Sequence, residues 1–262
     1  MSWVVVCLVA LGASALTLFS GFGLGTLLLP AFALVFPAEL AVAATAVVHL
    51  ANNLFKLALI GRNAQARKVL AFGLPALAGA AAGALLLKSL TDLPTVGAWQ
   101  LAGRTLEVTL LEIVLGTLIA GFAIVELRPK SGSRLAGRLG LGWGGLISGF
   151  SGGLSGHQGA LRSAFLVGSG LTKEQFIATG VCCAVLVDVA RLVVYGLAIL
   201  APLAAGGAGE TGWGLVVAAT VSAFAGAWIG VRMIGKVTLA GVRRLVGVLL
   251  VLVGLALAAG LL

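Results

Sequence analysis

The stretch FSGFGLGTLLLP, Phe19–Pro30, sets three glycines at alternate positions and follows them with a short apolar run and a proline. It lies inside an almost uncharged N-terminal segment. The apolar run that resumes after the glycines has only about half of the ~20 residues that a helix needs to cross a bilayer. The stretch therefore predicts a broken helix within a membrane-embedded region.

The composition of the whole chain is that of a multi-spanning membrane protein. Of the 262 residues, 60% are hydrophobic and 10% are charged, and the mean hydropathy is +1.17. So little polar surface cannot cover a soluble globule, and apolar runs of ~20 residues recur along the chain. The N-terminus lacks the basic region and cleavage site of a signal peptide, so we expect it to form the first membrane segment. We expect the cytoplasmic (inner) membrane, a lipid surround and no nucleic-acid partner.

Ten apolar segments indicate one unit used twice. They are 2–20, 26–36, 40–61, 69–88, 106–127, 139–155, 160–170, 175–203, 212–235 and 240–262. The second and the seventh are short, and each follows a glycine-rich break. The first break is SGFGLG, Ser20–Gly25, and the second is FSGGLSGHQG, Phe150–Gly159. We therefore predict two related membrane repeats, 1–127 and 139–262, joined by a polar cytoplasmic linker, 128–138.

The placement of basic residues indicates that the two halves are inverted. By the positive-inside rule, three clusters should face the cytoplasm: Arg62/Arg67/Lys68, Arg128/Lys130/Arg134/Arg138 and Arg232/Lys236/Arg243/Arg244. The basic loop 62–68 and the loop 204–211, which has no basic residue, occupy equivalent positions in the two halves. The sequence thus predicts an all-α polytopic integral membrane protein with both termini outside. It would consist of two inverted repeats, each with a glycine-broken helical hairpin plus three membrane helices.

The two breaks are predicted to form one anion site. Irregular backbone is tolerated at membrane depth where it is buried in protein or lines a wet cavity. A helix resumes at Thr26 and near Ala160, and its unpaired N–H groups and positive dipole end favour anions. We expect backbone N–H groups near Gly25, Thr26 and Gly159 to Leu161 to bind the substrate. The alternative is that the glycines only allow close packing of helices.

Polar side chains on one helix extend the predicted site. Thr45, His49, Asn52 and Lys56 share one face of segment 40–61, with Asn53 beside them. We expect His49, Asn52, Asn53 and Lys56 to contribute to substrate binding. Lys56 could instead snorkel to the inner surface, because it lies shortly before Arg62.

The equivalent helix of the second half carries Thr179, Asp188, Arg191 and Tyr195. Asp188 and Arg191 stand at i, i+3 and can form an ion pair, which lowers the cost of burying either charge. We expect Arg191 to help bind the substrate and Asp188 to take part in coupling. The alternative is a structural pair that holds the bundle together.

The second break adds His157, Gln158 and Arg162 to the predicted substrate site. Arg162 falls in the first turn of the short helix, where a cation opposes the helix dipole and a bound anion would relieve the conflict. His49 and His157 have no carboxylate or thiolate at ligand spacing, so hydrogen bonding is favoured over metal binding. The three cysteines lie in apolar runs. We expect no metal, cofactor or disulfide.

Glu112 is predicted to be the proton carrier. It lies well inside segment 106–127, on a face shared with Thr105, Thr109 and Gly116. A carboxylate at membrane depth marks an ion pathway, and Glu112 has no basic neighbour in sequence, whereas Arg191 should keep Asp188 ionised. No nucleotide-binding motif accompanies these residues, so an ATP-driven pump is unsupported.

The broken helix and its repeat carry a resemblance to a known family. The first copy is SGFGLGTLLLPAF followed by ELAVAATAVVHLANNLFKLAL, and the weaker second copy is SGGLSGHQGALRSAFL followed by EQFIATGVCCAVLVDVARLVVYG. With the GAAAG and GAWIG helices, Gly79–Gly83 and Gly226–Gly230, they resemble the sulfite exporter TauE/SafE family, also called the toluene sulfonate uptake permease family, over nearly the whole chain. The resemblance implies transport of small sulfur oxyanions or organosulfonates, such as sulfite or sulfoacetate, by an ion-coupled secondary mechanism.

Two other classes of function stay open. One is a secondary transporter of a different small anion, or of a cation bound by Asp188 and Glu112. The other is an integral-membrane enzyme or assembly subunit that acts on a lipid or thiol, with His49, His157 or Cys182 at its centre. We expect a transporter rather than an enzyme, working by alternating access of the two halves. A homodimer is left open.

Overall fold

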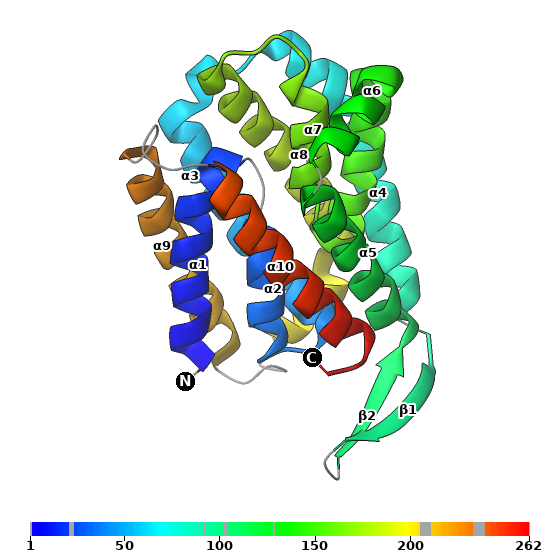
Figure 1. The fold of residues 1–262 in the computed structure, drawn as a ribbon. Helices are drawn as coiled ribbons and strands as arrows, with labels where there is room; N and C mark the ends of the chain where they lie inside the picture. Colours follow the sequence, from blue (N-terminus) through cyan, green and yellow to red (C-terminus); the bar gives the residue numbers. More distant parts are fainter. Residues whose placement is uncertain are drawn as a thin grey trace.

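The protein is a helical bundle with a β-hairpin projecting from one end, as Figure 1 shows for the computed structural model. The structure describes residues 2–20, 24–91, 93–101, 104–127, 129–204, 211–232 and 239–261. Within them the chain forms ten α-helices, one short 3-10 helix and one two-stranded hairpin. The prediction of a largely helical protein is confirmed. The prediction that the fold is all-α is wrong, because of the hairpin.

Each half of the chain begins with a long helix, a short helix and a second long helix. The first half contains α1 (Ser2–Ser20), α2 (Leu24–Ala33), α3 (Ala38–Ile60), η1 (Gly61–Asn63), α4 (Ala66–Thr91), β1 (Thr95–Leu101), β2 (Arg104–Thr109) and α5 (Leu110–Leu127). The second contains α6 (Pro129–Ser155), α7 (Gly159–Val167), α8 (Lys173–Ala204), α9 (Thr211–Arg232) and α10 (Leu239–Ala258). With 10 and 9 residues, α2 and α7 are too short to span a bilayer alone, which confirms the two predicted short segments.

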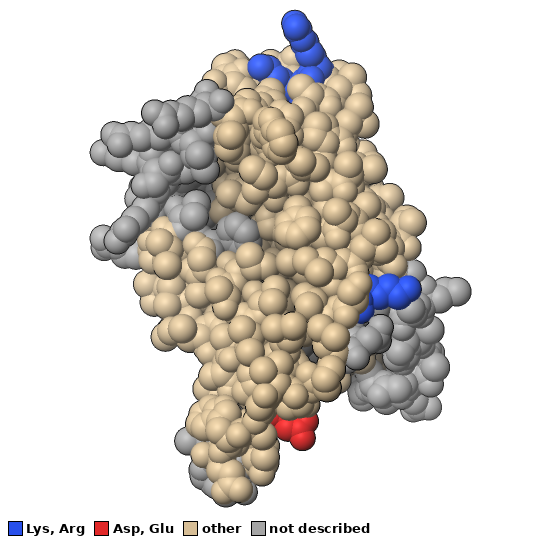
Figure 2. Space-filling view, turned by 90° about the vertical axis from the view of Figure 1, so that its right-hand side faces the viewer, with Lys and Arg blue, Asp and Glu red and all other residues tan. Residues whose placement is uncertain are grey.

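Four helices are long and apolar enough to cross a membrane within the described residues. They cover Leu40–Asn63, Ala66–Leu90, Lys173–Tyr195 and Gly212–Arg232. Their outward faces are apolar, and Figure 2 shows a broad surface that only a few charged side chains interrupt. A surface of this kind is stable against lipid rather than water, so the chain is an integral membrane protein.

The helices of the two halves pack on each other in a reciprocal way. α1 packs along α9, and α6 packs along α4; α3 packs against α8, and α5 against α10. Glycines let these backbones approach closely. A Cβ atom at Gly79 or Gly83 would overlap the backbone of α6, and one at Gly226 would overlap the backbone of α1. α1 and α6 are therefore each held by a helix of the other half of the chain.

Glu112 lies closer to a helix start than predicted, because β2 of the β-hairpin occupies residues 104–109. The predicted helix 106–127 begins instead at Leu110, because Thr109 and Glu112 form a capping box: the Glu112 carboxylate accepts from Thr109 N–H at 2.8 Å, and Thr109 Oγ1 accepts from Glu112 N–H at 3.2 Å. Glu112 thus caps the first turn of α5. The prediction that Glu112 lies well inside a membrane helix is wrong.

The hairpin and both chain ends lie at the same end of the bundle (Figure 1). β1 and β2 are antiparallel, with Trp99 opposite Leu106. Trp99 Nε1 donates a hydrogen bond to the carbonyl oxygen of Ala259 at 2.8 Å, just beyond α10. Gly260 follows with a φ of +67°, a value that favours glycine, and its backbone lies against Glu107. The β-hairpin thereby holds the residues that follow α10, Ala259 and Gly260, in place.

The start of α6 overlaps the predicted linker 128–138. The backbone from Pro129 onward is helical, and Gly140, with φ 73° and ψ 173°, separates this part from the rest of α6. For residues 129–138 the structure describes the backbone alone. At the other end of the second half, Arg232 is exposed and its guanidinium lies 3.1 Å from the ring centroid of Trp228.

Candidate functional site

The two glycine-rich breaks meet in the interior. A Cβ atom added to Gly25, at the start of α2, would lie 3.3 Å from the carbonyl oxygen of Gly156, between α6 and α7. The same atom would lie 3.6 Å from the ring of His49 and 3.8 Å from the methyl group of Thr45. Both breaks therefore border the predicted polar face of α3. Residues 21–23 of the first break lie outside the described residues, as does the side chain of Thr26.

The polar face of α3 is buried throughout. Thr45, His49, Asn52, Asn53 and Lys56 are each no more than 9% exposed. With its amide turned to suit its neighbours, Asn52 accepts from Lys56 Nζ at 3.0 Å and donates to the carbonyl of Ala223 in α9 at 3.1 Å. The alternative that Lys56 snorkels to the surface is wrong. α3 therefore presents one cation and several hydrogen-bonding groups to the interior.

Asp188 lies at the centre of a network that joins the two halves. Its Oδ2 is 2.6 Å from His49 Nδ1 and accepts from Asn53 Nδ2 at 2.9 Å. Its Oδ1 is 2.9 Å from Arg191 Nη2 and 3.4 Å from Gln158 Nε2. The predicted ion pair of Asp188 and Arg191 is confirmed. The network contains donors from α3, from the second break and from α8.

The second break is shaped around Arg191. Gly156 has a φ of +78°, and a Cβ atom there would lie 2.8 Å from Arg191 Nη1. A residue with a side chain would be strained by its backbone angle and would also press on the guanidinium. Hydrogen bonds fix both sides of the break: Ser148 Oγ donates to the carbonyl of Gln158 at 2.9 Å, and Tyr195 Oη donates to the carbonyl of Gly153 at 2.6 Å.

Arg162 lies in the first turn of α7, as predicted, and points toward α8. Its side chain is buried, and its Nε would be 3.5 Å from a Cβ atom on Gly180. Gly159 is the first residue of α7, and His157, whose Nδ1 is 2.8 Å from the carbonyl of Ser155, lies two residues before it. The N-terminus of α7, with its unpaired N–H groups, therefore faces the same interior as Arg162.

The site carries an excess of positive charge. Among the buried side chains that the structure describes, three are formally cationic, Lys56, Arg162 and Arg191, and Asp188 is the one carboxylate, which is a formal excess of two positive charges. Burying charge away from water is costly unless an opposite charge compensates it. An anion bound near Lys56 and Arg162 would supply that compensation.

Sequence reasoning missed several polar residues at the site. Ser14 of α1 is buried and hydrogen-bonded to Asn52 at 3.1 Å, and Ser163 of α7 is buried beside Arg162. Ser148, Ser151 and Ser155 line one face of α6 before the break. Their spacing of three and four residues was a signal that could have been used. Glu112 is the one predicted side chain that the structure places away from the site.

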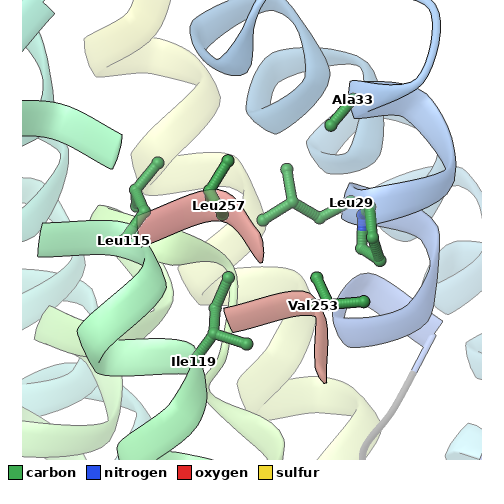
Figure 3. A pocket seen from close by; sticks show the side chains of 7 residues that line it. Leu29, Ala33, Leu115, Ile119, Val253 and Leu257 are labelled. Carbon is green, nitrogen blue, oxygen red and sulfur yellow. The ribbon is translucent and has the colours of Figure 1, made fainter. Parts of the chain in front are cut away.

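An apolar pocket elsewhere in the bundle does not suit a charged ligand. It lies between α2, α5 and α10, and Figure 3 shows its aliphatic lining. The lining residues are Leu29, Pro30, Ala33, Leu115, Ile119, Val253 and Leu257. None of them offers a side-chain hydrogen bond, so the polar interior between α3, α7 and α8 is the better candidate for an anion site.

Comparisons with known proteins agree with these features. The family model described as sulfite exporter TauE/SafE matches residues 6–257. Neither a curated protein nor a solved structure matches the chain. The family match includes both breaks, the polar face of α3 and the Asp188 network. The chain belongs to the sulfite exporter TauE/SafE family.

Proposed function

We propose that the protein is a secondary transporter that moves small sulfur oxyanions or organosulfonates, such as sulfite or sulfoacetate, across the cytoplasmic membrane. The observation that carries the proposal is the buried excess of two positive charges beside the breaks. Family membership supports a membrane transporter of sulfur anions. Proteins hold small oxyanions with such charge-assisted donors.

The substrate would bind between the two breaks. Arg162 and Lys56 would supply charge, and the N–H groups at the start of α7 would supply directed donors. His49, Asn52, Asn53, His157, Gln158 and Arg191 would complete the shell, with backbone N–H groups near Gly25 and Thr26 on the side of the first break. Several donors around one centre suit a tetrahedral or pyramidal oxyanion better than an extended molecule.

Transport would proceed by alternating access of two inverted repeats, 1–127 and 139–262, joined through 128–138. The reciprocal packing of α1 on α9 and of α6 on α4 supports a pseudo-twofold relation between the halves. Binding sites at such repeat interfaces, formed by broken helices, are typical of secondary transporters. We expect the three basic clusters to face the cytoplasm and the end with the hairpin and both termini to face outside.

Inversion predicts opposite sidedness for two equivalent loops. Single cysteines would replace Gln65, between α3 and α4, and Ala208, between α8 and α9, in a protein whose three native cysteines are exchanged for serine. An impermeant thiol reagent added to intact cells should label the cysteine at 208 and spare the one at 65. Permeabilised cells, in which both should react, are the control. Equal labelling of both positions from outside would contradict inverted repeats.

A panel of anions tests the proposed substrate class. A ligand that binds only the folded protein raises its apparent thermal stability. We expect sulfite or sulfoacetate to raise the melting temperature of detergent-solubilised protein, with sulfate, thiosulfate, taurine and acetate as comparisons at equal ionic strength. A shift with acetate alone would favour a transporter of a different anion. No shift with any anion, together with no uptake into proteoliposomes, would contradict the proposal.

The cation-transporter and enzyme alternatives receive less support. A cation would add to the buried positive excess. An enzyme centred on Cys182 would lose function when that residue is replaced, whereas the cysteine-free protein should still transport anions. The cysteine-free protein used for labelling therefore serves both tests.

A further inference from the structure

The side chains that donate to Asp188 are among those that we propose bind the substrate. His49, Asn53, Gln158 and Arg191 all turn a nitrogen toward the Asp188 carboxylate, at 2.6 to 3.4 Å. Asp188 is 0% exposed, so protein groups such as these compensate its charge in place of water. A carboxylate and a sulfur oxyanion make the same demand, because each is an acceptor that takes several N–H bonds. Asp188 thus occupies a position that suits an anionic group of the substrate.

The donors cannot bind two anions at once. Two negative charges within hydrogen-bond distance of the same nitrogens would repel each other strongly in a low-dielectric interior. One of them must leave, move or be neutralised when the other arrives. Neutralisation needs only a proton, and a neutral carboxylic acid can donate a hydrogen bond to the incoming anion.

We propose that Asp188 is the proton-binding site that couples anion transport to protons. This inference rests on the proposed function. In the empty protein the ionised carboxylate holds His49, Asn53, Gln158 and Arg191. A proton from the open side binds one Asp188 oxygen, the donors turn to the substrate, and the substrate takes the place of the carboxylate. One proton enters with the substrate and offsets one of its negative charges, and no covalent bond to the substrate is formed.

Other titratable or charged groups lie near Asp188, and the test must distinguish their protonation from that of Asp188. They are His49 on α3, Arg162 on α7 and, on α8 itself, Arg191 and Tyr195. His157, in the break, lies near His49 and Arg191. α4, which also packs on α8, has its described charges at its ends, at Arg67, Lys68 and Lys88, and Arg62 of η1 and Arg232 of α9 are exposed. Among the buried groups, His49 and His157 are the two whose ordinary titration range overlaps physiological pH, and His49 is the one in contact with Asp188.

The test is the pH dependence of anion affinity in the whole purified protein. Sulfoacetate keeps a constant charge between about pH 5.5 and about pH 8.5, since an ordinary carboxyl titrates near pH 4. We expect its affinity to rise as the pH falls, approaching tenfold per pH unit where Asp188 is ionised in the empty protein, because one proton is taken up per bound anion. In weakly buffered solution, binding should remove about one proton per anion from the medium.

Three variants assign the proton to a residue. Asp188→Asn should bind sulfoacetate with little pH dependence and without proton uptake, because the amide cannot titrate. Glu174→Gln removes an exposed carboxylate from the same helix and should retain the wild-type slope. His49→Gln should keep the slope even where its affinity is lower. If Asp188→Asn fails to fold, the proton count on the wild type and on His49→Gln still shows whether anion binding takes up a proton and whether His49 carries it.

The possible outcomes are distinct. Absence of binding to every panel anion at every pH would defeat the proposed function itself. Binding by the wild type without pH dependence or proton uptake would overturn only the role of Asp188. A slope that persists in Asp188→Asn, or that disappears in His49→Gln, would assign the proton to another residue and would also overturn the role of Asp188. If sulfite is the only anion that binds, the proton count is made with sulfite, comparing the wild type with Asp188→Asn.

Discussion

Replacing Arg162 with alanine is expected to weaken oxyanion binding by about tenfold or more. Arg162 is buried in the first turn of α7, where its guanidinium and the N–H groups of the helix start would share one anion. A hydrogen bond to a charged group contributes about 1.5–3 kcal/mol, and about 1.4 kcal/mol corresponds to one decade of affinity. The measurement is the dissociation constant of sulfite or sulfoacetate for the purified variant at constant ionic strength.

Two further variants separate charge, geometry and general basicity at this position. Arg162→Lys keeps the positive charge but loses the planar fork, so it should recover only part of the affinity. Arg62→Ala removes an exposed arginine from η1 and should leave the affinity unchanged. Unchanged binding in a folded Arg162→Ala protein would exclude Arg162 from the site and leave Lys56 and Arg191 as the cations that bind the substrate.

Features with a local signal could be predicted from the sequence. The breaks were visible because glycines at alternate positions interrupt apolar segments, and α2 and α7 are short as expected. The polar face of α3 was visible because residues three and four apart lie on one side of a helix. The ion pair of Asp188 and Arg191 follows from the same geometry, since it joins neighbouring turns of α8. Each of these inferences needed only one helix.

Pairings between helices could not be predicted in this way. His49 and Asp188 lie 139 residues apart, and Ser14 and Asn52 lie 38 apart. Which residues meet depends on the rotation and axial position of one helix against another, and side-chain packing sets these. The sequence identified His49 and Asp188 separately, but not the network in which the carboxylate meets four of the expected donors.

The error at Glu112 has a different origin, because the signal was present. Thr105 to Thr109, TLEVT, alternates polar and apolar residues, which is typical of a strand rather than a helix. Thr109 and Glu112 then have the T-x-x-E spacing of a capping box. The apolar run from Leu110 onward favours a helix so strongly that hydropathy alone places the helix start too early, at residue 106. Glu112 lies at the start of α5, next to the β-hairpin, and among the described residues it has no hydrogen bond to the donors around Asp188, which is why the proposed coupling proton is placed on Asp188.

Replacing Gly149 with leucine is expected to prevent stable folding, the largest effect on stability that we predict. Gly149 on α6 faces α4, and a Cβ atom there would overlap the backbone carbonyl of Ala76. Gly153, one turn further on, meets Ala80 in the same way, so the two helices touch through their backbones over successive turns. Backbone atoms cannot move aside as a flexible side chain can. Leucine would have to separate α4 from α6 and thereby displace the second break that α6 carries.

A graded series on one helix tests this argument. Gly149→Ala adds a single methyl group and should destabilise the protein by about 1–3 kcal/mol, the usual cost of overpacking. Gly142→Ala, on the same helix, meets no atom within 4 Å; it should be neutral or stabilising by up to about 1 kcal/mol, because alanine favours a helix more than glycine does. The measurements are the melting temperature in detergent and the yield of monodisperse protein. Equal stability of the two alanine variants would show that α4 and α6 are not in backbone contact. In that case the second break would not be held in place by the first half of the chain, and the reciprocal packing that supports alternating access would lose one of its two interfaces.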